Sequence, residues 1–317
     1  GLSRSAPGGR LTRRARRAML DLVQNTADGL MIGSSYALLA LGFTLIFGVM
    51  RRLNLSYGPS VMIGAYLGTF LYVQGGAGPL VVAGAVVAGA VVAGIYVERL
   101  CFAPMKAGAG VASMVSSFAI WMQLEQAAIL VLPRHTYAFP PISTAKPIEI
   151  GSIFLRIDHI VMFFCALALA AAVQIVLYRT RYGLALRAII GNPVAAHLVG
   201  IDVGRSILLA FVAASAIGGA AGFLVLAVDQ QVTPMFGMWA TLKGLIAMMI
   251  GGLGSIPGAV LGGLLLGVIE AHSQWCCGPQ FRDLAAYLVL FAFLVVRPGG
   301  LMGRPVTAEA TSPPQGT

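Results

Sequence analysis

The stretch LMIGSSYALLALGFTLIFGVM, Leu30–Met50, carries no charged side chain. A transmembrane helix needs about 17–25 consecutive apolar residues, so this stretch predicts a helix that crosses a bilayer. Seven further runs are mostly apolar, and the last of them is short: Tyr57–Val73, Leu80–Val97, Ala112–Leu132, Ile160–Tyr178, Ile207–Val228, Leu242–Ile269 and Leu284–Val296. None alternates with the two-residue period of a barrel strand. The sequence therefore predicts an all-α polytopic membrane protein with about eight transmembrane helices.

The composition of the whole chain agrees with this class. Of its 317 residues, 58% are hydrophobic and only 10% are charged, whereas soluble domains carry roughly 25% charged residues. A soluble protein of this size could not bury so much apolar surface. This excludes an ordinary soluble enzyme, a disordered chain and a collagen-like fibre. The 40 glycines suit helices that approach each other closely in lipid.

The chain divides into three parts. Residues 1–27 form an Arg-rich tail or interfacial segment, residues 28–304 a single transmembrane domain, and residues 305–317 a polar tail that we expect to be disordered. The net charge of +10 is concentrated in the first part and a few loops, which indicates a role in topology rather than nucleic-acid binding. No stretch is long enough for a soluble domain, so we expect any catalytic or ATP-binding unit to lie on another chain.

Basic residues in the loops predict the orientation, because cytoplasmic loops carry an excess of Lys and Arg. One set of loops contains Arg51, Arg52, Arg99, Lys106, Arg179, Arg181, Arg187, Arg205 and Arg282. The opposite set contains only Arg134, Lys146, Arg156 and Lys243. We therefore expect the first set in the cytoplasm. The Arg-rich tail opposes this orientation, since eight spans would leave it outside.

A short helix is expected in the long loop after the fifth run. Asn192 suits the N-cap position and Pro193 the first turn, while Gly200 ends the segment. Ala195, Ala196, Leu198 and Val199 make it small and mostly apolar. It is either a docking surface for a protein partner or a plain connecting loop.

Two Gly/Pro-containing breaks interrupt the apolar pattern, one in each half of the chain. They supply the candidate translocation residues Asn54, Ser56, Tyr57, Gly58, Gly251, Gly252, Gly254 and Pro257. Residues 242–269 would span about 42 Å as one helix, so an unwound segment fits within them. Such paired interruptions are typical of a translocation pathway. The alternative is close helix packing with an ordinary turn between spans.

The ionisable residues point to no chemistry of their own. Glu125 is the one carboxylate in the middle of an apolar run, and we expect it to face the bundle, either lining the route or tying helices together. Lys243 and Asp229 are expected to anchor at the interface. The histidines lack metal-ligand spacing, and neither a nucleophile elbow nor a phosphate loop is present. We expect no catalytic residue, metal or cofactor.

Several motifs resemble one family. RAIIGNPVAAHLVGID (Arg187–Asp202) is similar to the coupling loop of ATP-binding-cassette importer permeases, with Ala195, Ala196, Gly200 and Ile201 in matching places. Gly29–Tyr66 resembles the opening helices of the branched-chain amino-acid permease family. LKGLIAMMIGGLGSIPGAVLGGLLLGVIEA (Leu242–Ala271) and RPGGLMGR (Arg297–Arg304) resemble its Gly-rich seventh span and its ending.

The resemblance implies a multi-pass subunit of the bacterial inner membrane that imports branched-chain or other small amino acids. It implies two cytoplasmic ATPase subunits, a second identical or different permease subunit and a periplasmic solute-binding protein as partners. This chain has Pro59 where the family usually has a carboxylate. A urea or short-amide permease of the same family and a stand-alone solute channel are the alternatives.

Overall fold

The computed structural model describes residues 8–105, 110–131, 136–142, 148–150 and 153–303, and most of them are helical. The expected polar tail, residues 305–317, lies outside the described residues. The helices are α1 (Gly8–Met50), α2 (Tyr57–Gly75), α3 (Pro79–Val97), the π-helical turn η1 (Glu98–Phe102), α4 (Gly110–Val131), α5 (Ile157–Arg179), α6 (Arg181–Gly191), α7 (Pro193–Leu198), α8 (Val203–Asp229), α9 (Phe236–Gly251), α10 (Ile256–Cys277) and α11 (Phe281–Val296).

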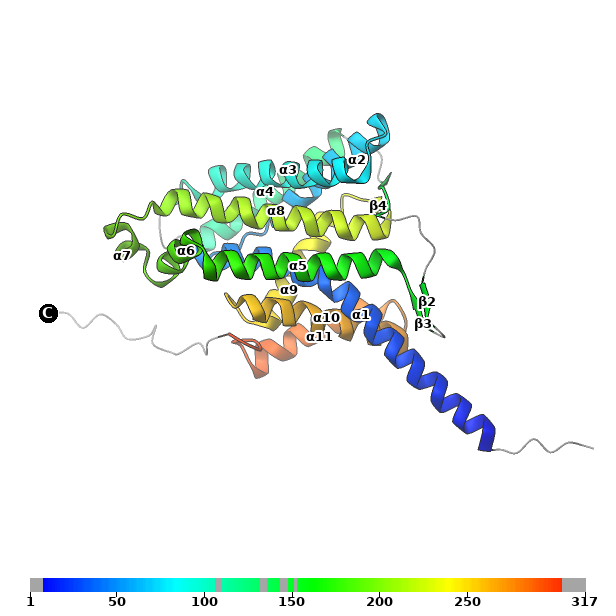
Figure 1. Ribbon diagram of the computed structural model, residues 1–317. Coiled ribbons are helices and arrows are strands. Elements are labelled where there is room, and N and C mark those ends of the chain that lie inside the picture. Colours follow the sequence, from blue (N-terminus) through cyan, green and yellow to red (C-terminus); the bar gives the residue numbers. More distant parts are fainter. Residues whose placement is uncertain (1–7, 106–109, 132–135, 143–147, 151–152, 304–317) are drawn as a thin grey trace, which may run out of the picture.

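Short strands supply the little remaining regular structure. They pair antiparallel, β1 (Tyr137–Ala138) with β4 (Gln231–Val232) and β2 (Ile148–Ile150) with β3 (Ile153–Leu155). Figure 1 shows α6 and α7 at one end of the bundle and the strands β2–β4 at the other. In the described part of the chain, six helices are long and apolar enough to cross a membrane: α1, α3 with η1, α4, α5, α8 and α10. The prediction of an all-α polytopic membrane protein is confirmed.

The expected seventh span, Leu242–Ile269, is wrong as a single helix. α9 ends at Gly251 and α10 begins at Ile256, and the two helices pack antiparallel. Gly252 and Gly254 have φ angles of 112° and 79°, a region that favours glycine, and they turn the chain between the helices. The apolar run is longer than one span because it holds parts of two helices.

This hairpin moves the loop between α10 and α11 to the other end of the bundle. Arg282 was expected among the loops at the α7 end, but it lies in one cavity with Arg156, where α5 begins. Arg52, Arg99 and Arg205 share a groove with Pro193 and stay at the α7 end. α1 begins at the end opposite α7 (Figure 1), so the Arg-rich segment still opposes the majority of the loops.

α1 lies at the centre of the bundle, in contact with α5, α8, α9 and α10. Its closest approach is to α10, where both helices present small residues. A Cβ atom on Gly263 would lie 2.3 Å from the backbone nitrogen of Ala37, closer than atoms can approach without displacement. The absence of a side chain at Gly263 therefore sets the distance between α1 and α10.

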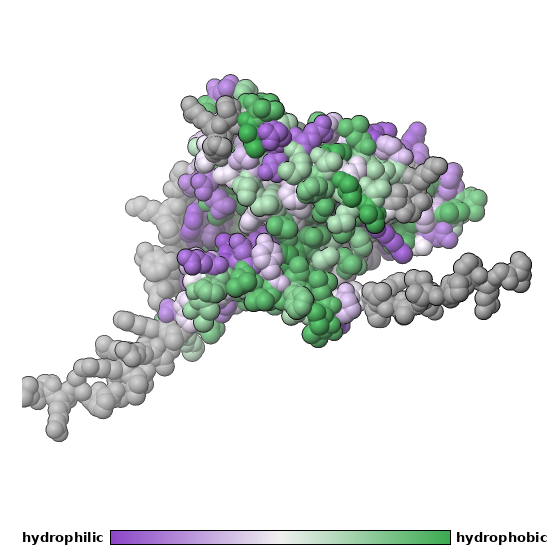
Figure 2. Space-filling view, turned by 180° about the vertical axis from the view of Figure 1, so that it is seen from behind, coloured by the Kyte–Doolittle hydropathy of each residue, from purple (hydrophilic) through white to green (hydrophobic). Residues whose placement is uncertain are grey.

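The outer helices expose large apolar side chains. α4 and α5 are the least buried of the long helices, and Phe118, Leu130, Phe164 and Ile175 are all exposed on them. In the space-filling view, hydrophobic residues cover much of the face and hydrophilic ones gather mainly toward its ends (Figure 2). Exposed apolar surface of this extent is the kind that contacts lipid or another subunit.

The α1–α10 contact yields a matched pair of glycine substitutions. Gly263→Ala should force the two helices apart and lower the stability of the purified protein by about 1–3 kcal/mol. Gly84→Ala adds the same methyl group to α3, where nothing lies within 4 Å, and should leave stability unchanged or slightly raised. Thermal unfolding in detergent, followed by loss of the monodisperse peak, compares them. Equal melting temperatures would contradict the close packing.

Candidate functional site

The first sequence break, residues 51–56, is non-helical backbone that runs from the exposed Arg51 into the interior of the bundle. Asn54 and Ser56 are both buried, and the Asn54 side-chain oxygen accepts a hydrogen bond from the Ser56 backbone N–H at 3.0 Å. Ser117 of α4 accepts from the Leu55 backbone N–H at 3.2 Å, and its carbonyl accepts from the Ser56 hydroxyl. Backbone without helical hydrogen bonds survives at membrane depth only when protein or water satisfies it in this way.

Tyr57 and Gly58 begin α2 directly after this break and bring it against two other helices. The buried Tyr57 hydroxyl donates to the carbonyl of Ala214 in α8 at 3.1 Å. A Cβ on Gly58 would lie 2.1 Å from the carbonyl oxygen of Gly237 in α9. The Tyr57 ring also lies against Gly42, which is more than two turns, or about 12 Å, before the end of α1. The end of the break is therefore well inside the bundle.

The second break, Gly251–Gly258, is a turn at the α7 end. Leu253 and Gly254 are exposed, while Ser255 caps α10 by accepting from the Gly258 N–H at 3.2 Å, with Pro257 in the first turn. The chain after α11 packs on this turn, where the Leu301 N–H donates to the Ile250 carbonyl at 2.8 Å.

The two breaks are therefore not brought together. Gly58 contacts α9 near its first turn, whereas Gly251 and Gly252 end the same helix. We expected two unwound segments that lie at the same depth in the membrane. The structure instead has one buried break, before α2, and one turn between α9 and α10. Of the candidate pathway residues, Asn54, Ser56, Tyr57 and Gly58 form a single cluster.

Glu125 lies on α4, partly buried and away from that cluster. Its carboxylate accepts a hydrogen bond from the Trp121 indole N–H at 2.7 Å, one turn earlier on the same helix. An intrahelical indole partner partly offsets the loss of water around a carboxylate in an apolar helix. The neighbouring Gln123 accepts a hydrogen bond from the Tyr96 hydroxyl of α3 at 3.0 Å.

The short helix expected after the fifth apolar run is α7, and it lies between the residues predicted to cap it. The Asn192 side chain accepts hydrogen bonds from the N–H groups of Val194 and Ala195, at 3.0 and 3.1 Å. Pro193 takes the first turn, and Gly200 follows the helix with a φ of 86°. α6 precedes α7 and α8 follows it, so α7 forms the tip of a helical loop (Figure 1).

The apolar residues of α7 divide between two faces, and this differs from the expected Ala surface. Ala196 is buried in the core of this chain, and its carbonyl accepts from the Ile201 N–H at 3.1 Å. Val194, Leu198 and Val199 are instead exposed, Leu198 at 84%. An outside partner would therefore meet the larger aliphatic residues, because Ala196 holds α7 against its own protein.

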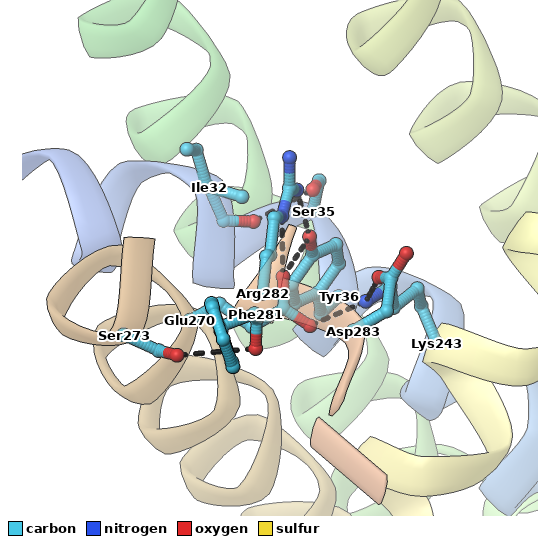
Figure 3. A network of polar contacts seen from close by, with 9 residues as sticks. All are labelled: Ile32, Ser35, Tyr36, Lys243, Glu270, Ser273, Phe281, Arg282 and Asp283. Carbon is cyan, nitrogen blue, oxygen red and sulfur yellow. Dashed lines mark hydrogen bonds and ion pairs between the residues drawn. The ribbon is translucent and has the colours of Figure 1, made fainter. Parts of the chain in front are cut away.

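A charge network built around the buried pair Lys243 and Glu270, which sequence reasoning missed, joins α1, α9, α10 and α11 (Figure 3). The Lys243 ammonium donates to Glu270 at 2.5 Å and to Asp283 at 2.7 Å. The Arg282 Nε donates to the other Glu270 oxygen at 2.8 Å, and the Tyr36 hydroxyl donates to that oxygen at 2.7 Å. Two cations and two anions thus compensate each other in the bundle.

The network corrects the expectation that Lys243 anchors at the interface. Its side chain is only 5% exposed and that of Glu270 2%, so both charges depend on each other rather than on water. Lys243 and Glu270 stand near opposite ends of the long Gly-rich run. Folding that run at its glycines brings them within reach of each other, and this was the available sequence signal.

A cavity of about 230 Å³ opens beside the network, at the end opposite α7. It lies where α5 and α11 begin and α8 ends, next to α1 and α9. Arg156, Arg282 and Asp229 give it charge, and Val225 and Trp239 are among its apolar walls. Among the described residues, no group of three or more His, Cys, Asp or Glu could hold a metal ion.

The network yields a stability prediction with a matched surface control. Lys243→Ala should destabilise the protein by about 3–5 kcal/mol, because it breaks a buried ion pair and leaves the Glu270 carboxylate with Arg282 as its remaining cation. Arg205→Ala removes an exposed ion pair with Asp202 and should change stability little. Chemical unfolding in detergent would compare the free energies of unfolding of the two variants. Equal values would mean that water solvates the Lys243–Glu270 pair in the folded protein.

The chain is similar to a set of known transport proteins along most of its length. Residues 25–296 match the family described as branched-chain amino acid transport system permease component. The high-affinity branched-chain amino acid transport system permease protein BraD of Pseudomonas aeruginosa is 30% identical, over 89% of this chain and 96% of that protein. LivH of Escherichia coli, with the same description, is 30% identical over 90% and 97%.

A more distant relative is the probable branched-chain amino acid transport permease protein LivH of Methanocaldococcus jannaschii, 27% identical over 87% of this chain and 91% of that protein. These matches span the central helix α1, the buried break, α7 and the charge network alike. The chain belongs to the family of branched-chain amino acid transport system permease components.

Proposed function

We propose that this protein is the membrane subunit of an ATP-binding-cassette importer that moves branched-chain or other small amino acids across the bacterial inner membrane. The observation that carries the proposal is the family match over residues 25–296. The capped helix α7, presented at the end that carries most of the loop arginines, supports it.

The proposal includes three kinds of partner. Two ATPase subunits hydrolyse ATP on the cytoplasmic side, and a solute-binding protein delivers the amino acid on the other side. A second permease subunit, identical or different, completes the membrane unit. The exposed apolar faces of α4 and α5 offer surface for that subunit as well as for lipid.

The coupling step would begin at α7. The exposed Val194 and Leu198 of α7, with Val199 directly after it, would sit in a groove of the ATPase, and closure of the ATPases would move the loop. α8 begins only a few residues after α7 and contacts α2 through the Tyr57–Ala214 hydrogen bond. A shift of α8 would thus reach the buried break and change the side to which the pathway opens.

Transport by the reconstituted complex tests the function. Proteoliposomes holding the permease, its ATPases and its second subunit should accumulate labelled leucine only with ATP and the loaded binding protein. Accumulation of urea or acetamide instead of leucine would assign the other solute class. Passive leucine flux without the ATPases would indicate a stand-alone channel.

The coupling role of α7 yields a charge-insertion prediction. Leu198→Glu puts a carboxylate where an aliphatic side chain would be desolvated, so the ATPase should no longer co-purify with the permease. Met235→Glu makes a similar change at an exposed site directly before α9, at the end of the bundle opposite α7, and should keep the ATPase bound. Equal co-purification of the ATPase with both variants would contradict docking at α7.

A further inference from the structure

The cavity beside the charge network has a charge arrangement that fits one class of solute. Arg156 directly precedes the first residue of α5, and Arg282 lies in the first turn of α11. Asp229 is the last residue of α8. Helix beginnings carry partial positive charge and helix ends partial negative charge, so the dipoles of these helices reinforce the side chains around them. One part of the cavity is therefore positive and another negative.

We propose that this cavity binds an α-amino acid with an aliphatic side chain on its way into the translocation pathway. The inference rests on the proposed function and names the site for its solute. The carboxylate of the amino acid would lie between Arg156 and Arg282, and its ammonium group would pair with Asp229 at the end of α8.

The arginines have donors available for a carboxylate. Arg282 uses Nε for Glu270 and Nη2 for Tyr36, while its Nη1 makes no hydrogen bond within the described part of the chain. Figure 3 shows one end of the guanidinium pointing away from Glu270 and Tyr36. Arg156 is 49% exposed, and its ion pair with Asp158 is long, at 3.5 Å. A charge-assisted hydrogen bond from a guanidinium held in place this way is strong.

Asp229 is available for an ammonium group. It is exposed, and within the described residues its carboxylate makes no hydrogen bond or ion pair. Arg156 and Arg282 both attract its charge across the cavity. An arriving zwitterion would satisfy all three side chains at once, because it brings a negative group to the arginines and a positive group to Asp229.

The apolar lining residues suit an aliphatic side chain, and Ser35 and His159 complete the lining of the cavity. Ile32, Met162, Val225, Val228 and Trp239 come from four helices and leave apolar surface around the charged groups. Trp239 is fixed by an edge contact with Tyr36 and a stacked contact with Phe236, at 5.7 and 5.8 Å between ring centroids. Burying a branched alkyl group against these walls is favourable at roughly 25 cal/mol per Å².

A neutral solute fits this site less well. Urea or acetamide would displace water from two arginines and an aspartate without supplying a charge to either. Partial loss of hydration without a compensating ion pair costs free energy. The cavity therefore favours the amino-acid alternative over the amide alternative for this chain. Its position at the end opposite α7 is where a delivered solute would enter.

The test uses the complete importer in proteoliposomes and measures leucine imported per ATP hydrolysed. Asp229→Asn and Arg156→Gln should each lower that ratio about tenfold, the effect of losing one charge-assisted hydrogen bond. Stimulation of the ATPase by the loaded binding protein should persist, because neither residue belongs to α7 or to the buried network. Arg156→Lys should retain more import than Arg156→Gln. Asp21→Asn, an exposed site outside the cavity on α1, is the matched control and should behave as wild type.

A second measurement reads binding without transport. With Trp121 and Trp275 replaced by Phe, Trp239 is the one tryptophan left in the purified permease, and its fluorescence should change saturably with leucine. Leucinol lacks the carboxylate and 4-methylpentanoate lacks the ammonium group, so neither should compete at similar concentrations. Asp229→Asn should weaken the leucine response about tenfold, even if that variant assembles too poorly for transport.

The outcomes separate the two proposals. A wild-type complex that imports no leucine with ATP would overturn the proposed function. A wild-type complex that imports leucine, with Asp229→Asn and Arg156→Gln keeping its ratio of leucine to ATP, would overturn the cavity site alone. Equal fluorescence responses to leucine, leucinol and 4-methylpentanoate would overturn the recognition of a zwitterion.

Discussion

The ammonium group of Lys243 lies among apolar helices, where a lone charge would be costly, and Glu270 and Asp283 compensate it. This requirement brings α9, α10 and α11 together, because the lysine and its two partners lie on three different helices. Arg282 and Tyr36 extend the same network to the central helix α1. The arrangement of the second half of the chain depends on these contacts.

The hairpin of α9 and α10 sets the rest of the geometry. It returns the chain to the end opposite α7, so that α11 begins beside the start of α5 and the end of α8. Arg282 consequently serves two places, since it closes the charge network on one side and lines the cavity on the other. The other end of the hairpin, at Gly252, carries the segment that follows α11.

Sequence reasoning succeeded where a local rule decides the structure. Hydropathy alone predicts Leu30–Met50 as part of a membrane helix, and capping rules predict the start of α7 at Asn192. It failed where contacts between residues distant in sequence determine the structure. Hydropathy cannot tell one long broken helix from a hairpin, and the partners of Lys243 are distant in sequence. The inward face of Ala196 likewise depends on packing against other segments rather than on the composition of α7.

The central claim is that the charged residues of the Gly-rich run meet because the run is a hairpin, and single-cysteine labelling tests this most directly. In a background with Cys165, Cys276 and Cys277 replaced by Ser, Leu253→Cys and Gln280→Cys are labelled with a membrane-impermeant maleimide from each side. Both positions are exposed in the protein. The hairpin predicts that Leu253→Cys reacts from the cytoplasmic side and Gln280→Cys from the opposite side. An unreactive Leu253→Cys together with a Gln280→Cys that reacts from the cytoplasm would contradict it.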